Sequence, residues 1–94
     1  MSQTTIRIPA PLRSLTGGAS EVTVEAASVG EALQALGNQH EGLVERILDG
    51  NGDLRAFVNL YLGDSNVRSL DGLGTAIEAP SVLHIVPAVA GGTR

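Results

Sequence analysis

The order of hydrophobic periods along the chain is the feature that most restricts its fold. Two segments alternate apolar and polar residues as strands do, and the next has the spacing of an amphipathic helix. The segments that follow return to the period of strands. The predicted order is therefore strand, strand, helix, strand, short strand, strand, and few folds accommodate it within 94 residues.

The first two strands are predicted over residues 4–8 and 21–25, where apolar and polar residues alternate. Pro9 and Pro11 end the first strand, because proline cannot donate a ladder hydrogen bond. A turn with two glycines separates the two strands, so they are predicted to form a hairpin. Their inward-facing residues are expected to be Ile6, Ile8, Val22 and Val24.

A helix is predicted to begin after Ser28, which forms a capping-box pattern with Glu31. Its apolar residues are spaced for one face: Val29, Ala32, Leu33 and Leu36. The pair Gly37 and Asn38 is predicted to stop this helix. A second, short helical turn is expected within residues 42–48.

The second half of the chain is predicted to contain three strands. Residues 55–62 alternate, with Ala56, Val58, Leu60 and Leu62 on one face and the two aromatic residues on the other. A short edge strand is expected over residues 66–69 and a helical turn over 73–77. The last strand is predicted over residues 82–86, closed by Pro87.

The composition excludes several classes of function. The net charge is −4 and the charges are scattered, which argues against nucleic-acid binding. No apolar run is long enough to span a membrane, and the amino end lacks the pattern of a secretion signal, so a cytoplasmic location is expected. The chain has no cysteine and no lysine, so it offers neither a thiol nucleophile nor an amine side chain that accepts an acyl group.

The motifs that suggest metal binding or catalysis are weak. Residues 49–53 imitate the start of a calcium loop, but the sixth and twelfth positions, which need glycine and a carboxylate, hold Leu54 and Leu60. His40 and His84 are far apart and lack the spacing of metal ligands. No serine, histidine and carboxylate pattern of a hydrolase is present. We therefore expect neither a metal site, nor a bound cofactor, nor enzymatic activity in this chain itself.

The chain is predicted to divide into a folded domain over residues 1–87 and a tail over 88–94. The tail follows the strand that Pro87 closes, and it contains Gly91 and Gly92. Because glycine lacks Cβ, two successive glycines can pass through a narrow channel and adopt dihedrals closed to other residues. Val89 and Ala90 keep the preceding stretch slim and apolar.

Residues 81–92 resemble the last strand and tail of a ubiquitin-like β-grasp protein, and their ending Pro-Ala-Val-Ala-Gly-Gly resembles the MoaD/ThiS family of sulfur carriers. Two internal segments are similar to the CysO-type branch of that family: Arg-Ala-Phe-Val-Asn-Leu-Tyr at 55–61 and Asp-Gly-Leu-Gly-Thr-Ala-Ile at 71–77. The opening residues 6–9 and 16–18 share this resemblance. It implies an α+β fold of the β-grasp type, in which a mixed sheet packs on one main helix.

The resemblance also implies a mechanism. An E1-like enzyme of the MoeB type would adenylate the carboxylate of Gly92 with ATP, and sulfur would replace the adenylate to give a thiocarboxylate. The carrier would then present the sulfur to a biosynthetic enzyme, in the CysO-type branch a cysteine synthase-like one. A terminal carboxylate is anionic at neutral pH, so its acyl carbon needs such activation before a nucleophile can attack.

Thr93 and Arg94 depart from the family pattern, because an amide bond from Gly92 to Thr93 leaves no carboxylate to activate. We expect a precursor that a peptidase trims, and the resemblance implies a metalloprotease of the JAMM type. The alternative is that the two residues are a peculiarity of this sequence.

A partner-docking surface is predicted on the open face of the sheet. If alternation holds, it consists of Phe57, Asn59, Tyr61, His84 and Val86. Exposed aromatic and aliphatic side chains beside the tail are suited to docking. The alternatives are that a loop or helical turn covers these residues, and that His84 is an ordinary surface histidine.

Three other functions remain open at the level of sequence. The chain could be a ubiquitin-like protein modifier, whose activated Gly92 is transferred to lysines of other proteins. It could be the small subunit of molybdopterin synthase, or a plain β-grasp interaction module without chemistry at its tail.

Overall fold

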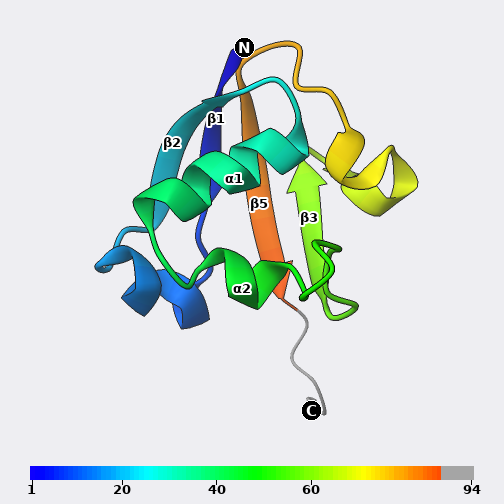
Figure 1. The fold of residues 1–94 in the computed structure, drawn as a ribbon. Helices are drawn as coiled ribbons and strands as arrows, with labels where there is room; N and C mark the ends of the chain where they lie inside the picture. The colour runs from blue at the N-terminus through cyan, green and yellow to red at the C-terminus, as the bar shows by residue number, and fades with distance from the viewer. Residues whose placement is uncertain (88–94) are drawn as a thin grey trace.

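The computed structural model describes residues 1–87 and shows a single mixed sheet with helices on one side (Figure 1). The predicted tail, residues 88–94, lies outside the described residues. The sheet has the strand order β2-β1-β5-β3-β4. Its strands are β1 Ser2–Arg7, β2 Glu21–Ala26, β3 Val58–Leu62, β4 Ser65–Asn66 and β5 Ser81–Pro87.

The last strand of the sequence occupies the middle of the sheet. β5 runs parallel to β1 and antiparallel to β3, while β1 pairs with β2 and β3 with β4 in antiparallel fashion. The helix α1, Val29–Gln39, crosses one face of this sheet (Figure 1). The predicted α+β fold of the β-grasp type, a mixed sheet on one main helix, is confirmed.

The amino-terminal hairpin forms as its alternation predicts. Ile6, Ile8, Val22 and Val24 are buried. Between the two strands, where a turn was expected, the structure has a 3-10 helix η1, Ala10–Thr16. Proline near its start supplies the φ that a helical turn needs, and Gly17 ends it with a left-handed φ of 68°.

The start of α1 is capped largely as predicted. The Ser28 Oγ accepts a hydrogen bond from the Glu31 amide at 3.2 Å. The Glu31 carboxylate accepts one from the amide of Ala27 at 3.2 Å, one residue before the cap rather than at the cap itself. The first of these bonds satisfies an amide of the first helical turn, which has no partner within the helix.

The predicted end of this helix is wrong. α1 continues through Gly37 to Gln39, and Gly37 serves helix packing instead. A Cβ on Gly37 would lie 2.8 Å from Cγ2 of Val44, at the start of the short helix α2, Val44–Ile47. Glycine is therefore needed here for the close approach of α2, which the sequence had predicted within residues 42–48.

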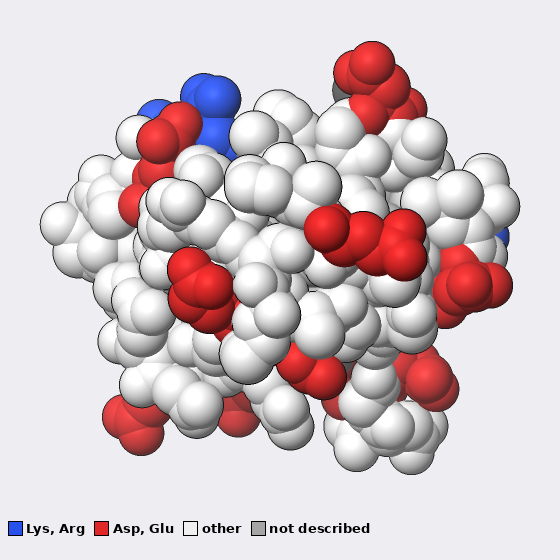
Figure 2. All heavy atoms as spheres, turned by 90° about the horizontal axis from the view of Figure 1, so that it is seen from above, with Lys and Arg blue, Asp and Glu red and all other residues white. Residues whose placement is uncertain are grey.

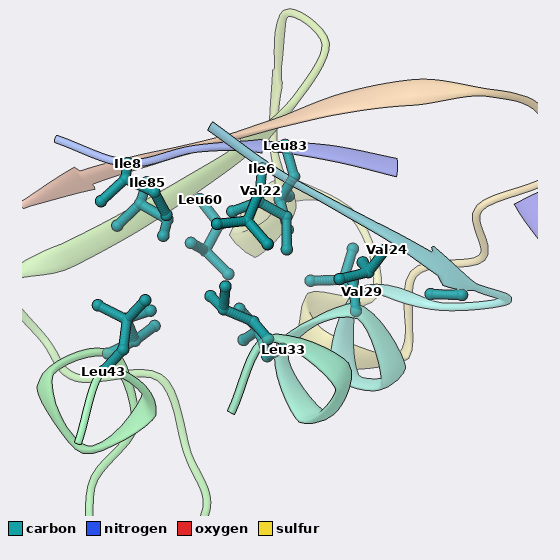
Figure 3. Close-up of a cluster of buried hydrophobic side chains, with 14 of the residues drawn as sticks. Ile6, Ile8, Val22, Val24, Val29, Leu33, Leu43, Leu60, Leu83 and Ile85 are labelled. Carbon is teal, nitrogen blue, oxygen red and sulfur yellow. The ribbon is translucent and has the colours of Figure 1, made fainter. Parts of the chain in front are cut away.

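The core lies between the inner face of the sheet and the helices α1 and α2 (Figure 3). The side chains that Figure 3 labels in this layer are aliphatic and come from both sides of it: Ile6, Ile8, Val22, Val24, Val29, Leu33, Leu43, Leu60, Leu83 and Ile85. Burial of this apolar surface, at about 25 cal/mol per Å², stabilises the fold.

The segments around β3 differ from the predicted boundaries. β3 begins at Val58, so residues 55–57 precede the strand, and Ala56 is exposed rather than inward. The edge strand β4 overlaps the predicted 66–69 segment only at Asn66, and the rest of that segment forms a second 3-10 turn, η2 Val67–Ser69.

The predicted helical turn over 73–77 is also displaced. A third 3-10 turn, η3, spans Gly72–Gly74, and the following residues are extended. They are extended because they pair with the segment that enters α1: the amide of Val29 donates to the Thr75 carbonyl at 3.0 Å, and that of Ile77 to the Ala27 carbonyl at 2.9 Å. Within residues 1–87, no helix has the length and apolar character needed to cross a membrane.

Candidate functional site

The open face of the sheet brings together four of the five predicted docking residues. In the antiparallel register of β3 and β5, Tyr61 lies opposite His84 and Asn59 lies opposite Val86. Leu83 and Ile85, which alternate with these residues in β5, are buried. The pleat of the strand therefore turns His84 and Val86 to the face that α1 and α2 leave open (Figure 1).

The apolar part of this face is exposed and includes one residue that the sequence reasoning missed. Val86 is 43% exposed, and Val82 is 37% exposed. Val82 alternates with Leu83 in the same strand, so the signal that predicted His84 and Val86 could have identified it as well. We refer to Asn59, Tyr61, Val82, His84 and Val86 as the open-face group.

Hydrogen bonds fix the polar edges of the open-face group. The Asn59 Oδ1 accepts from Arg68 Nε at 3.2 Å and from Asn66 Nδ2 at 3.5 Å. On the other side of β5, Arg7 lies beside His84 in the parallel register and forms an ion pair with Glu21 at 3.1 Å. This pair is half exposed, so it contributes little to stability.

Phe57 does not share this face. It lies in the turn before β3, is 49% exposed, and lines a hollow of about 350 Å³ together with Leu12, Val58 and Pro87. Because Val58 faces the core side of the sheet, the hollow lies on the other side of the sheet from the open-face group. The expectation that Phe57 alternates with Asn59 fails because the strand begins one residue after Phe57.

The acidic loop before β3 is organised by its own backbone. The Asp49 Oδ1 accepts hydrogen bonds from the amides of Asn51 at 2.8 Å and Asp53 at 3.1 Å, which is an Asx-type turn. Across residues 1–87, no three histidine, cysteine or carboxylate side chains are grouped so that they could hold a metal ion.

The described chain stops at Pro87, which lies opposite Val58 at the end of the central strand. The four predicted tail residues, Val89, Ala90, Gly91 and Gly92, lie outside the described residues.

The last strand of the sequence lies in the middle of the sheet, one main helix packs on one face, and the other face is open. These features define a ubiquitin-like β-grasp protein. Comparison with known families then identifies the group within this class. The pattern of the ThiS family matches residues 6–92, and the chain belongs to this family.

Its relatives include sulfur carriers. The chain is 40% identical to Sulfur carrier protein CysO of Mycobacterium tuberculosis over 90 residues, which cover 94% of this chain and 97% of that protein. Its structure is similar to CysO in the crystal structure of the Amycolatopsis orientalis BexX/CysO complex, with a TM-score of 0.88, 36% identity and coverage of 95% and 99% of the two chains.

A third relative points to another role. The chain is 33% identical to Small archaeal modifier protein 3 of Haloferax volcanii over 66 residues, which cover 70% of this chain and 71% of that protein. The same fold therefore occurs in relatives named as sulfur carriers and in relatives named as modifier proteins.

Proposed function

We propose that this protein is a sulfur carrier whose reacting group is the carboxylate of Gly92. The observation that carries the proposal is the 40% identity to a sulfur carrier over 94% of this chain, whose tail contains Gly91 and Gly92. The protein is the substrate of partner enzymes in this proposal, and the catalytic groups belong to those partners.

Two displacements convert the carboxylate into a sulfur donor. A carboxylate oxygen attacks the α-phosphorus of ATP on an E1-like enzyme of the MoeB type, and pyrophosphate leaves. Hydrosulfide then attacks the acyl carbon of the adenylate, loses its proton, and AMP leaves as the bond between carbon and the AMP oxygen breaks. The product is a thiocarboxylate on Gly92.

The open-face group is the proposed docking surface for the activating enzyme. It combines exposed valines with an aromatic and an imidazole side chain, and three of its members lie in β5, the strand that precedes the tail. Such mixed apolar surfaces of fixed geometry are suited to recognition, because little conformational entropy is lost on binding.

Activation requires a free carboxylate on Gly92, so the bond to Thr93 must first be hydrolysed. We propose that a metalloprotease of the JAMM type performs this step. The activation consumes ATP, and we place it in the cytoplasm. The similarity to CysO favours a cysteine synthase-like enzyme as the sulfur acceptor.

The test uses two versions of the chain, one ending at Gly92 and one retaining Thr93 and Arg94. Each is incubated with the E1-like enzyme of the same organism, ATP and sulfide, and its intact mass is measured. The shorter chain should show the mass change of one oxygen replaced by sulfur, and the longer chain should not. Absence of the change in the shorter chain, with an enzyme active on another carrier, would contradict the proposal.

Protein modification is the second candidate, and the similarity to Small archaeal modifier protein 3 favours it. It shares the adenylation step but ends in an amide with a lysine of another protein. The chain has no lysine, so it cannot form chains linked to itself through that side chain. Adducts of higher mass that resist thiols, found by immunoblotting of a cell lysate, would support this role.

A further inference from the structure

A hollow lies at the end of the molecule where the described chain stops. Figure 1 shows α2, the loop before β3 and the end of β5 meeting there. The walls are apolar on the side of Leu12, Phe57 and Pro87, and they carry the side chains of Arg46 and Arg55. Its volume of about 350 Å³ is suited to one or two side chains of a partner.

Phe57 is held in place at the edge of this hollow by Arg68. The Arg68 Nη2 donates to the carbonyls of Arg55 at 2.6 Å and Val58 at 2.8 Å, on both sides of Phe57. The amide of Val58 also donates to the Arg55 carbonyl at 3.0 Å. The turn is thus closed by three hydrogen bonds, and the aromatic ring that it exposes needs little ordering on binding.

The cations of the hollow have no carboxylate partner within the described residues. The one ion pair found in residues 1–87 joins Arg7 to Glu21, so neither Arg46 nor Arg55 pairs with a carboxylate of these residues. Glu45 also lines the hollow, and Arg55 Nε donates to its backbone carbonyl at 2.9 Å. Two guanidinium groups therefore face one carboxylate.

This local excess of positive charge contrasts with the rest of the protein. The chain has a net charge of −4. Figure 2 looks down on the end of the molecule opposite the hollow and shows acidic side chains across it, with basic ones only near its edges. Within the lining of the hollow, two guanidinium groups outnumber one carboxylate, and this favours a partner segment that carries negative charge.

We propose that the hollow is a second docking site, which receives an acidic segment of the activating enzyme. An apolar side chain of that segment would pack on Leu12, Phe57 and Pro87, and its carboxylates would pair with Arg46 and Arg55. The enzyme would then hold the last strand from both sides, through the open-face group and through the hollow. This inference rests on the proposed function.

The experiment measures binding of the E1-like enzyme to chains ending at Gly92, by calorimetry at two salt concentrations. Phe57→Ala should weaken binding roughly tenfold, because aromatic anchors dominate interface energetics. Arg46→Gln removes a charge and breaks no side-chain hydrogen bond within residues 1–87, and it should weaken binding about fivefold and reduce its salt dependence. The matched control is Leu70→Ala, another exposed apolar residue, which should bind like the wild type.

A double-mutant cycle tests the role of Arg68. Arg68→Ala should raise the KM for adenylation and leave kcat unchanged, and its effect should be smaller when Phe57 is already alanine. The effect that remains then belongs to the lost hydrogen bond to Asn59 in the open-face group. Circular dichroism checks that each variant keeps its fold. An additive effect of the two substitutions would show that Arg68 does not act through Phe57, and would overturn that part of the inference.

Three outcomes separate this inference from the proposed function. If the wild type is adenylated and Phe57→Ala and Arg46→Gln bind equally well, the inference is wrong and the proposed function stands. If the wild type is not adenylated, both fail. If sedimentation shows a dimer of this chain that Phe57→Ala dissociates, the hollow is a contact between copies and the inference is overturned.

Discussion

Gly72 and Gly74 lie two residues apart in the turn η3, and only Gly72 has a positive φ, at 60°. A Cβ at either position meets no atom within 4 Å, so neither alanine substitution causes a steric clash. Gly72→Ala should lower the free energy of unfolding by about 1 kcal/mol relative to Gly74→Ala, because an L-residue in the left-handed region is strained. Both substitutions change the conformational entropy of the unfolded chain equally. The difference between the two unfolding free energies, measured by urea titration, therefore reports the backbone strain at Gly72 in the folded state. Equal stabilities would contradict the assigned φ of Gly72.

At the scale of elements, α1 depends on its cap as well as on its apolar face. Ser28→Ala removes the bond to the Glu31 amide and should destabilise the protein by about 1 kcal/mol. The control is Ser14→Ala in η1, an exposed serine, which should have little effect. Thermal unfolding followed by circular dichroism compares the two. If Ser14→Ala costs as much as Ser28→Ala, the effect belongs to serine in general and not to the cap.

At the scale of the whole molecule, the residues of the core all precede the proposed reacting group in the sequence. The buried residues lie between the sheet and the helices, whereas Gly91 and Gly92 follow the end of the central strand. In a chain ending at Gly92, Gly91→Leu should abolish thiocarboxylate formation without changing the Tm, because a side chain there would obstruct a narrow channel in the enzyme.

The control for this prediction is Gly50→Leu, a substitution of the same size in a loop where a Cβ meets no atom within 4 Å. It should leave both thiocarboxylate formation and the Tm unchanged. Full activity of Gly91→Leu would mean that the partner does not require a slender tail.

Local patterns were enough for much of the fold. The inward residues of β1 and β2, the cap at Ser28 and the inward residues of β5 follow from periods and capping signals that act within a few residues. The same alternation correctly grouped Asn59, Tyr61, His84 and Val86 on one face. These features depend on side-chain direction along one element, which neighbouring residues set.

Only the tertiary structure decided the features that depend on distant partners. β3 begins at Val58, where its pairing with Pro87 starts, while Arg68 closes the turn before it, so Phe57 lies at the hollow instead of the open face. Gly37 lies within α1 at a position where a Cβ would meet Val44 of α2, so its role depends on a contact between two helices. The hydrophobic period of a segment predicts the face to which each side chain points. It does not predict which other segment packs on that face, because such contacts form only when residues far apart in the chain are brought together.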